Sequence, residues 1–193
     1  IVSSTGSAPL LPPIAGLKDR IDNENHNIYS ILGMISHIND FPKDLEGKKV
    51  VVVGGGAVGL DVVEFFADRN ADISIVEMMD QIGRDLDPVS KNDTKTMMKK
   101  HNVHQLTKTA LLEVKDSSFL VRGDGEPYEL PFEYGFVCLG MRAQGQLYQN
   151  LTEEFSSEDV EIMNIGDSQR ARRIIDGTQE GRNILTVLEQ KGY

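Results

Sequence analysis

Short, mainly apolar runs along this chain alternate with longer mixed segments, which predicts strands separated by helices. The runs at residues 50–53, 73–76 and 134–139 are typical of buried strands in a parallel sheet. Between the first two, residues 57–70 carry apolar side chains at helical spacing. The pattern therefore predicts a strand–helix–strand unit in the first half of the chain.

Further elements are expected around this unit. Asp87 and Pro88 suit the N-cap and the first position of a helix, so a helix is predicted from there to about Lys100. Residues 103–132 alternate β-rich runs with turn signals, which favours a small antiparallel meander. The other expected elements are a strand at the start of the chain, a short helix at 28–38, a strand at 160–165 and a helix at 174–190. The predicted fold class is α/β, a Rossmann-like three-layer domain with a parallel sheet and a small antiparallel β-meander.

A glycine pattern occupies the junction between the first strand and the following helix. Gly54, Gly56 and Gly59 fit G-x-G-x-x-G. The first suits a tight turn, the second the close approach of a pyrophosphate, and the third close packing of the helix on the strand. The helix start at Ala57 and Val58 adds free N–H groups and a positive dipole end. We predict a dinucleotide site here, with a purely structural turn as the alternative.

An acidic residue at the end of the second strand strengthens this prediction. Glu77 lies 23 positions after Gly54, close to the spacing of about 20 expected for a carboxylate that hydrogen-bonds an adenosine ribose. A carboxylate there repels a 2′-phosphate, and Met78 and Met79 add no positive charge, so NADH is expected in preference to NADPH. Arg84 lies close enough in the sequence to weaken that preference.

Composition excludes several classes of function. The 193 residues carry a formal net charge of −10, which argues against nucleic acid or an anionic membrane as partner. We find no apolar run that approaches a membrane span and no basic start of a secretory signal. Cys138 is the only cysteine, which excludes an internal disulfide and a Cys-x-x-Cys centre. A cytoplasmic protein is the simplest interpretation.

The sequence predicts no catalytic side chain and no metal site. His101 and His104 stand three positions apart, but no cysteine or carboxylate pair completes a zinc site, so surface histidines are favoured. Arg170, Arg172 and Arg173 form the one basic cluster. A solvated helix end is favoured there over contact with a cofactor phosphate or a partner domain. No nucleophile motif such as G-x-S-x-G is present.

Four short motifs occur along the chain, and their order is informative. They are residues 2–9 (VSSTGSAP), 54–59 (GGGAVG), 137–140 (VCLG) and 165–167 (IGD). In that order they resemble the two-dinucleotide-binding flavoproteins, which include the pyridine nucleotide-disulfide oxidoreductases. Residues 52–66, 82–88 and the ending from 165 onward most resemble the group of dienoyl-CoA reductase, NADH:flavin oxidoreductase and trimethylamine dehydrogenase.

The resemblance implies an NAD(P)H domain inserted into an FAD domain, with hydride passing from nicotinamide to FAD. Thr5, Gly6, Gly166 and Asp167 would then belong to the FAD half. Asp167 matches the position whose carboxylate accepts hydrogen bonds from the flavin's ribityl chain. A helix N-cap is the alternative for this aspartate.

The resemblance also implies roles for two positions in the NAD(H) half. Gly140 matches the strand end where the backbone passes close to the nicotinamide half of NAD(H), with an ordinary turn as the alternative. Asp61 stands where the group often has Glu, near the nicotinamide ribose or carboxamide. Its shorter side chain departs from that pattern.

Three parts are expected along the chain. Residues 1–46 would be an FAD-domain remnant and linker, 47–143 the NAD(H)-binding domain, and 144–193 a second FAD-domain remnant with the Gly-Asp motif and the C-terminal helix. A complete member of the group carries an earlier G-x-G-x-x-G, cluster cysteines and an N-terminal barrel, which these residues lack. We therefore expect a fragment, with the other FAD half, FMN and an iron–sulfur cluster belonging to the missing part.

The expected function is the NADH-binding portion of a flavin-dependent oxidoreductase. It would pass hydride from NADH to FAD and feed reduction of an unsaturated substrate elsewhere in the full protein, while the isolated fragment would be inactive. The alternative is a non-catalytic NAD(H)-binding module for redox sensing or assembly. A dehydrogenase with its own substrate domain is disfavoured, since the roughly 50 residues after Gly140 are too few for one.

Overall fold

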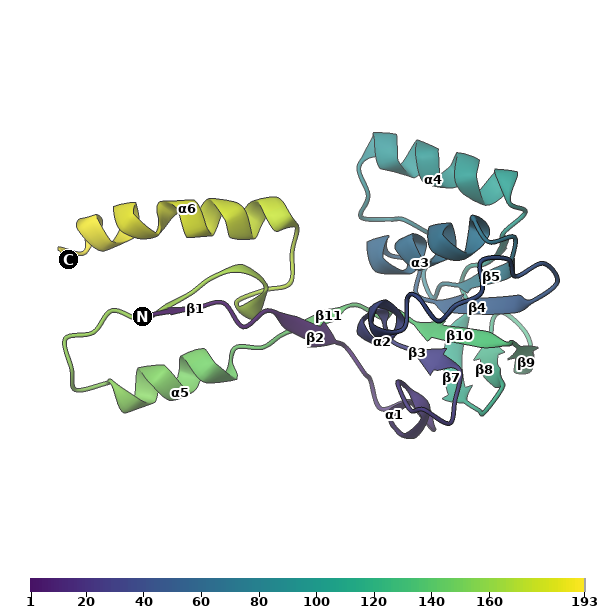
Figure 1. Cartoon of the computed structure of the whole chain (residues 1–193), viewed down its shortest axis with the longest axis horizontal. Coiled ribbons are helices and arrows are strands. Elements are labelled where there is room, and N and C mark those ends of the chain that lie inside the picture. The colour runs from purple at the N-terminus through teal and green to yellow at the C-terminus, as the bar shows by residue number, and fades with distance from the viewer. Residues whose placement is uncertain (193) are drawn as a thin grey trace. The chain divides into compact units, whose positions relative to one another are not determined.

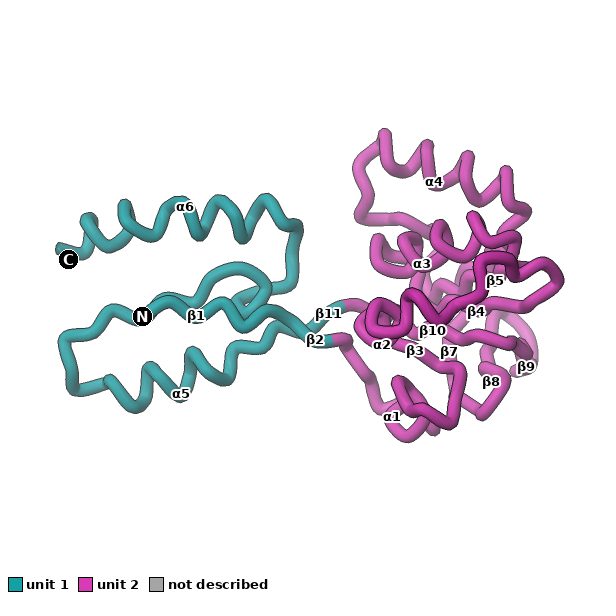
Figure 2. Tube along the Cα trace, in the orientation of Figure 1, with its two compact units in different colours: residues 1–8, 141–193 teal, residues 9–140 magenta. Residues whose placement is uncertain are grey.

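The computed structural model describes residues 1–192, which form two compact units (Figure 2). The larger unit spans residues 9–140, and the smaller combines residues 1–8 with the chain from Met141 onward. The first boundary thus falls well before the one expected after residue 46. Its physical reason is that Leu17, Ile21 and Ile28 are buried in the core of the larger unit.

A five-stranded sheet forms the centre of the larger unit (Figure 1). In spatial order its strands are β3 (Ile28–Tyr29), β10 (Tyr134–Val137), β4 (Lys49–Val53), β5 (Asp72–Val76) and β6 (His104–Leu106). Every neighbouring pair is parallel. The predicted parallel sheet is confirmed.

Both faces of this sheet are covered, as the unbroken valine run of β4 predicts. Val50 and Val52 belong to a core cluster shared with α3, whereas Val51 and Val53 belong to a second cluster shared with the antiparallel strands. All four side chains are at most 3% exposed. Alternation along the strand therefore produces three layers, with helices on one face and the meander on the other.

The helical layer contains α2 (Ile31–Ser36), α3 (Ala57–Ala67) and α4 (Pro88–Lys100), with α4 outside α3 (Figure 1). Asp87 caps α4 as expected, because its Oδ1 accepts the backbone N–H groups of Val89 at 3.0 Å and Ser90 at 3.1 Å. Hydrogen bonds from Ser90 lower the pKa of Asp87. The predicted start and end of α4 are confirmed.

On the other face lie β7 (Ala110–Val114), β8 (Ser118–Arg122) and β9 (Tyr128–Pro131), an antiparallel meander with α1 (Leu17–Arg20) beside it. It covers only the later part of the predicted range 103–132, because β6 pairs with β5 in the central sheet. Phe119 and Phe132 pack there with ring centroids 4.5 Å apart. A Cβ on Gly135 of β10 would lie 2.7 Å from Phe119 Cζ. Glycine in the central sheet thus makes room for this aromatic pair.

The smaller unit is built on a parallel pair, β1 (Val2–Ser3) and β12 (Met163–Asn164). Around it lie α5 (Gln146–Glu154), the short 3₁₀ helix η1 (Gly166–Ser168) and α6 (Ile174–Gln190). The chain passes between the units at β2 (Ser7–Pro9) and β11 (Met141–Ala143). Neither α5 nor α6 contains a buried residue.

Two sequence predictions were wrong in detail. Residues 28–38 form a strand and then a helix, because Ser30 ends the strand and caps α2 through a hydrogen bond from Gly33 N–H at 3.1 Å. The Asp22 carboxylate fixes Ser30 by accepting its N–H at 2.7 Å and its hydroxyl at 2.6 Å. α5 was not among the predicted elements, although Leu147 and Leu151 lie at helical spacing in it.

Candidate dinucleotide site at the glycine turn

Two glycines of the motif are required by the protein's own packing. Gly54 has a φ of +109°, and a Cβ there would lie 2.1 Å from the carbonyl oxygen of Cys138. A Cβ on Gly59 would lie 1.9 Å from the carbonyl oxygen of Gly54. These are the tight turn and the close packing of helix on strand that the motif predicts.

Gly56 is different, because nothing in the protein requires glycine there. Its φ of −80° and ψ of −177° are open to any residue. A Cβ on Gly56 would meet no protein atom within 4 Å. Glycine at this position leaves the backbone open to the close approach of a ligand.

The start of α3 presents unpaired donors beside Gly56. No side chain caps this helix. Within residues 1–192, no acceptor is found for the backbone N–H groups of Gly56, Ala57 or Val58. Such N–H groups at the positive end of an 11-residue helix suit an anion.

Glu77 follows β5 and contacts the glycine turn directly. Its Oε2 accepts the Gly55 N–H at 2.6 Å, and its Oε1 accepts the Met79 N–H at 2.7 Å. Each carboxylate oxygen can accept a second hydrogen bond. The half-buried carboxylate is therefore tied to the backbone and still able to accept from a ribose hydroxyl.

A cavity of about 590 Å³ opens beside these residues, within the usual range of ~300–1,000 Å³ for ligand pockets. Its lining comprises Leu10, Pro12, Ile14, Val53, Gly54, Gly56, Ala57, Val58, Val76, Glu77, Met78, Thr109, Ala110, Leu111, Cys138, Leu139 and Gly140. The wall is mostly apolar, and Glu77 is the one acidic or basic residue in it. A second hollow of about 250 Å³ shares Gly56 and Glu77 and includes Arg84.

The structure brings together most of the predicted residues of the NAD(H) half. Gly54, Gly56, Ala57, Val58, Glu77 and Gly140 all line the larger cavity. Gly59 is buried behind it against the turn. Apolar walls from residues 10–14 and 109–111 were not foreseen, since no local pattern marks them as neighbours of the turn.

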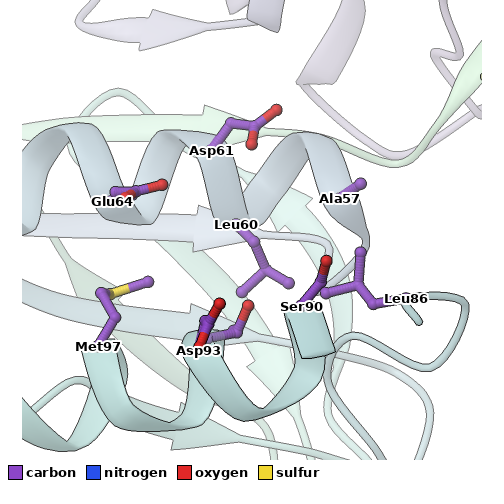
Figure 3. A pocket seen from close by; sticks show the side chains of 9 residues that line it. Ala57, Leu60, Asp61, Glu64, Leu86, Ser90, Asp93 and Met97 are labelled. Atoms are coloured by element: carbon purple, nitrogen blue, oxygen red, sulfur yellow. The ribbon is translucent and has the colours of Figure 1, made fainter. Parts of the chain in front are cut away.

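Asp61 is not among the residues that line this cavity but borders a groove of about 350 Å³ between α3 and α4, with its side chain pointing away from α4 (Figure 3). The groove also contains Glu64, Ser90 and Asp93. Partial shielding from water and the neighbouring Glu64 raise the pKa of Asp61. Residues 1–192 contain no group of three side chains able to hold a metal ion.

Cys138 lines the cavity as a buried free thiol. Burial, and then the nearby negative charge of Asp61, raise its pKa to about 12. The thiolate is the nucleophilic form, so this cysteine is inert near neutral pH.

We expect iodoacetamide to alkylate Cys138 at pH 8 far more slowly in the folded chain than in urea, as measured by mass spectrometry. The pKa of this thiol is 9.0 in an ordinary setting and about 12 in the folded chain, so the unfolded thiol loses its proton at a lower pH than the folded one. The contribution of this group to stability should therefore fall between pH 9 and about 12. Equal alkylation rates in the two states would contradict the burial.

In the smaller unit, the four residues assigned to the FAD half follow neighbouring parallel strands. Thr5 and Gly6 come after β1, and Gly166 and Asp167 come after β12. Asp167 Oδ2 accepts the Ser7 hydroxyl at 3.2 Å. Asp167 is not an N-cap, because Ile165 precedes η1 and Arg173 precedes α6.

The histidines and arginines singled out in the sequence take ordinary places. His101 ends α4, and His104 Nε2 lies 3.5 Å from Asp72 Oδ1 on an exposed edge. Arg172 pairs with Glu180, whose Oε2 also accepts the Gly166 N–H at 2.7 Å. That N–H and Arg172 lower the pKa of Glu180.

Comparison with known proteins decides the family. The model of the pyridine nucleotide-disulphide oxidoreductase family matches residues 1–164. The chain belongs to this family. The resemblance drawn from its motifs is thereby confirmed.

Two curated relatives in this comparison are reductases or oxidases. The NADH oxidase of Thermoanaerobacter brockii is 26% identical over 185 residues, covering 95% of this chain and 27% of the relative. The bilirubin reductase of Mediterraneibacter gnavus is 26% identical over 191 residues, covering 97% of this chain and 27% of the relative. The chain thus spans little more than a quarter of either protein.

A solved structure of 2-naphthoyl-CoA reductase in complex with 2-naphthoyl-CoA shares the fold. Its TM-score is 0.75 at 21% identity, over 93% of this chain and 25% of that one. This likeness supports the α/β architecture of the family. Among residues 1–192, no helix has the length and apolar character needed to span a bilayer.

Proposed function

We propose that residues 9–140 bind NADH across the glycine turn. The pyrophosphate would meet the N–H groups of Gly56, Ala57 and Val58, and the adenosine ribose would meet Glu77. The nicotinamide half would lie toward Gly140. The observation that carries the proposal is the combination at Gly56 of open space beside the backbone and unpaired N–H groups at the start of α3.

NADH is favoured over NADPH because the ribose position carries a carboxylate. Glu77 already accepts two backbone N–H groups, and these bonds hold its carboxylate beside the glycine turn. A 2′-phosphate beside it would be repelled. Arg84 lines the neighbouring hollow and would offset part of that repulsion.

We propose that the smaller unit belongs to an FAD domain completed by the rest of a larger flavoprotein. Thr5, Gly6, Gly166 and Asp167 would face FAD there. In support, Ile174 at 91% and Leu185 at 72% are strongly exposed on α6. Apolar side chains left uncovered on an amphipathic helix are expected to pack on another element.

When bound, NADH supplies a hydride, which FAD accepts. This chain's own contribution would be to hold, orient and shield the dinucleotide. The apolar walls from Leu10, Ile14 and Leu111 would exclude water beside the cofactor. Transfer between two rings needs no general acid or base, which fits a cavity without histidine and with a protonated Cys138.

In the full protein, we propose that the electrons reduce an unsaturated substrate outside this chain. The names bilirubin reductase and 2-naphthoyl-CoA reductase, borne by a relative and by a similar structure, support that class of reaction. FMN and an iron–sulfur cluster would belong to the same outside part.

Titration calorimetry of the purified chain with NADH and with NADPH tests the binding proposal. We expect saturable one-to-one binding of NADH and weaker binding of NADPH. Absence of heat with both cofactors, in a chain shown to be folded by circular dichroism, would contradict it.

Replacing the ribose carboxylate should change cofactor preference. In Glu77→Ala we expect NADH affinity to fall about tenfold, from the loss of charge-assisted hydrogen bonds worth ~1.5–3 kcal/mol. NADPH affinity should fall less, because the repulsion of its 2′-phosphate also disappears. The ratio of the two dissociation constants measures the change, and an unchanged ratio would remove Glu77 from the ribose site.

A further inference from the structure

The middle residue of the three successive glycines is not explained by the dinucleotide motif, which leaves that position free. In the structure, this residue, Gly55, is held by two hydrogen bonds. Gly55 N–H donates to Glu77 Oε2 at 2.6 Å, and Gly55 C=O accepts the N–H of Gly83 at 2.7 Å. Both polar groups of Gly55 are therefore held by the segment 77–83.

We propose that this segment is a clamp that presets the glycine turn for the pyrophosphate, with Glu77 and Gly83 as positioning residues. The inference rests on the proposed function and adds to it. Glu77 would then influence binding through the backbone as well as through any contact with the ribose.

Peptide geometry links the clamp to the ligand. The Gly55 carbonyl and the Gly56 N–H belong to one planar peptide group. A hydrogen bond that fixes this carbonyl therefore fixes the direction of the Gly56 N–H. That N–H is the first of the unpaired donors at the start of α3.

The clamp is itself firmly anchored. Glu77 C=O accepts the Thr109 N–H at 2.9 Å, and Met79 C=O accepts the Lys108 N–H at 2.9 Å. The bond from Met79 N–H to Glu77 Oε1 at 2.7 Å fixes the carboxylate. A preset turn avoids the ordering cost that a loose turn would add to binding.

Local sequence suits this arrangement. A Cβ on Gly55 would lie 3.0 Å from Glu77 Oε2 and 3.1 Å from Ile82 Cγ1, so a side chain there would push the carboxylate away. Gly83 has a φ of +66°, which glycine adopts without strain. Gly55 and Gly83 are buried, whereas Gly56 is exposed. Charge-assisted bonds that are screened from water are the stronger kind.

Amide hydrogen exchange in the ligand-free chain tests the clamp without any cofactor. In Glu77→Ala, exchange at Gly55 should accelerate about tenfold or more, as expected for the loss of a hydrogen bond to a charged group. Glu77→Gln should restore much of the protection, since its amide oxygen can accept the same N–H. Glu126→Gln, an exposed acid far from the turn in sequence, serves as the charge-matched control and should match the parent.

Binding of two ligands then separates positioning from ribose contact. The probes are NADH and its analogue lacking both adenosine ribose hydroxyls. A clamp predicts that Glu77→Ala weakens binding of the analogue as well, about tenfold, whereas a ribose contact alone would weaken only NADH.

Parental exchange at Gly55 in Glu77→Ala, or full affinity of that variant for the analogue, would overturn the proposal. A parent that binds neither ligand would refute the proposed function. Exchange at Gly55 would still decide for or against the clamp in that case.

Discussion

Gly56→Val should abolish NADH binding while leaving the fold intact. The new side chain would enter open space that no protein atom occupies within 4 Å of its Cβ, which is where the pyrophosphate would lie. We expect the dissociation constant to rise at least ~100-fold, equivalent to about 2.7 kcal/mol. The backbone at this position is extended, so valine adds no strain there. Calorimetry with NADH measures the loss.

Two measurements make this prediction specific. The unfolding midpoint in urea should stay close to that of the parent. Gly125→Val, at another glycine with no atom within 4 Å and no positive φ, should bind NADH normally. Parental affinity in Gly56→Val would show that nothing approaches the backbone there, and the site would be misplaced.

Gly54→Val should have the opposite effect, since it should lower the stability of the fold itself, whatever it does to NADH binding. Its Cβ would lie 2.1 Å from the Cys138 carbonyl oxygen, at a φ of +109° that valine does not tolerate. The backbone of β4 or β10 would have to move in the centre of the sheet. We expect unfolding free energy to fall by ~3 kcal/mol or more, the size associated with overpacking combined with backbone strain.

Urea unfolding followed by circular dichroism measures this loss, with Gly125→Val again as the control. A variant that fails to fold agrees with the prediction. Stability within ~0.5 kcal/mol of the parent would show that the turn is looser than the structure has it.

Local patterns were enough to predict the centre of the molecule. The valine run, the glycine spacing and the acid 23 positions later all lie within one strand–helix–strand unit, where sequence distance and spatial distance agree. The cap at Asp87 was predictable for the same reason. The structure of a parallel strand pair and its crossover helix can be deduced from residues that are close together in the sequence.

Contacts between distant segments could not be deduced in this way. Leu10 and Leu111 reach the cavity only because the strands and loops around the sheet bring them there. Asp61 was placed near the nicotinamide by resemblance, and that role stays a prediction. Its side chain points away from α4 (Figure 3), and its charge acts on Cys138, which is distant in sequence. The role of Gly83 depends on a turn that no spacing rule describes.

The central claim is that the dinucleotide lies on the glycine turn of the larger unit. Backbone amide NMR of the labelled chain during titration with NADH tests it most directly. We predict the largest shifts at Gly56, Ala57 and Val58, with smaller ones near Glu77 and Gly140. Shifts confined to the groove between α3 and α4, or to the smaller unit, would contradict the account.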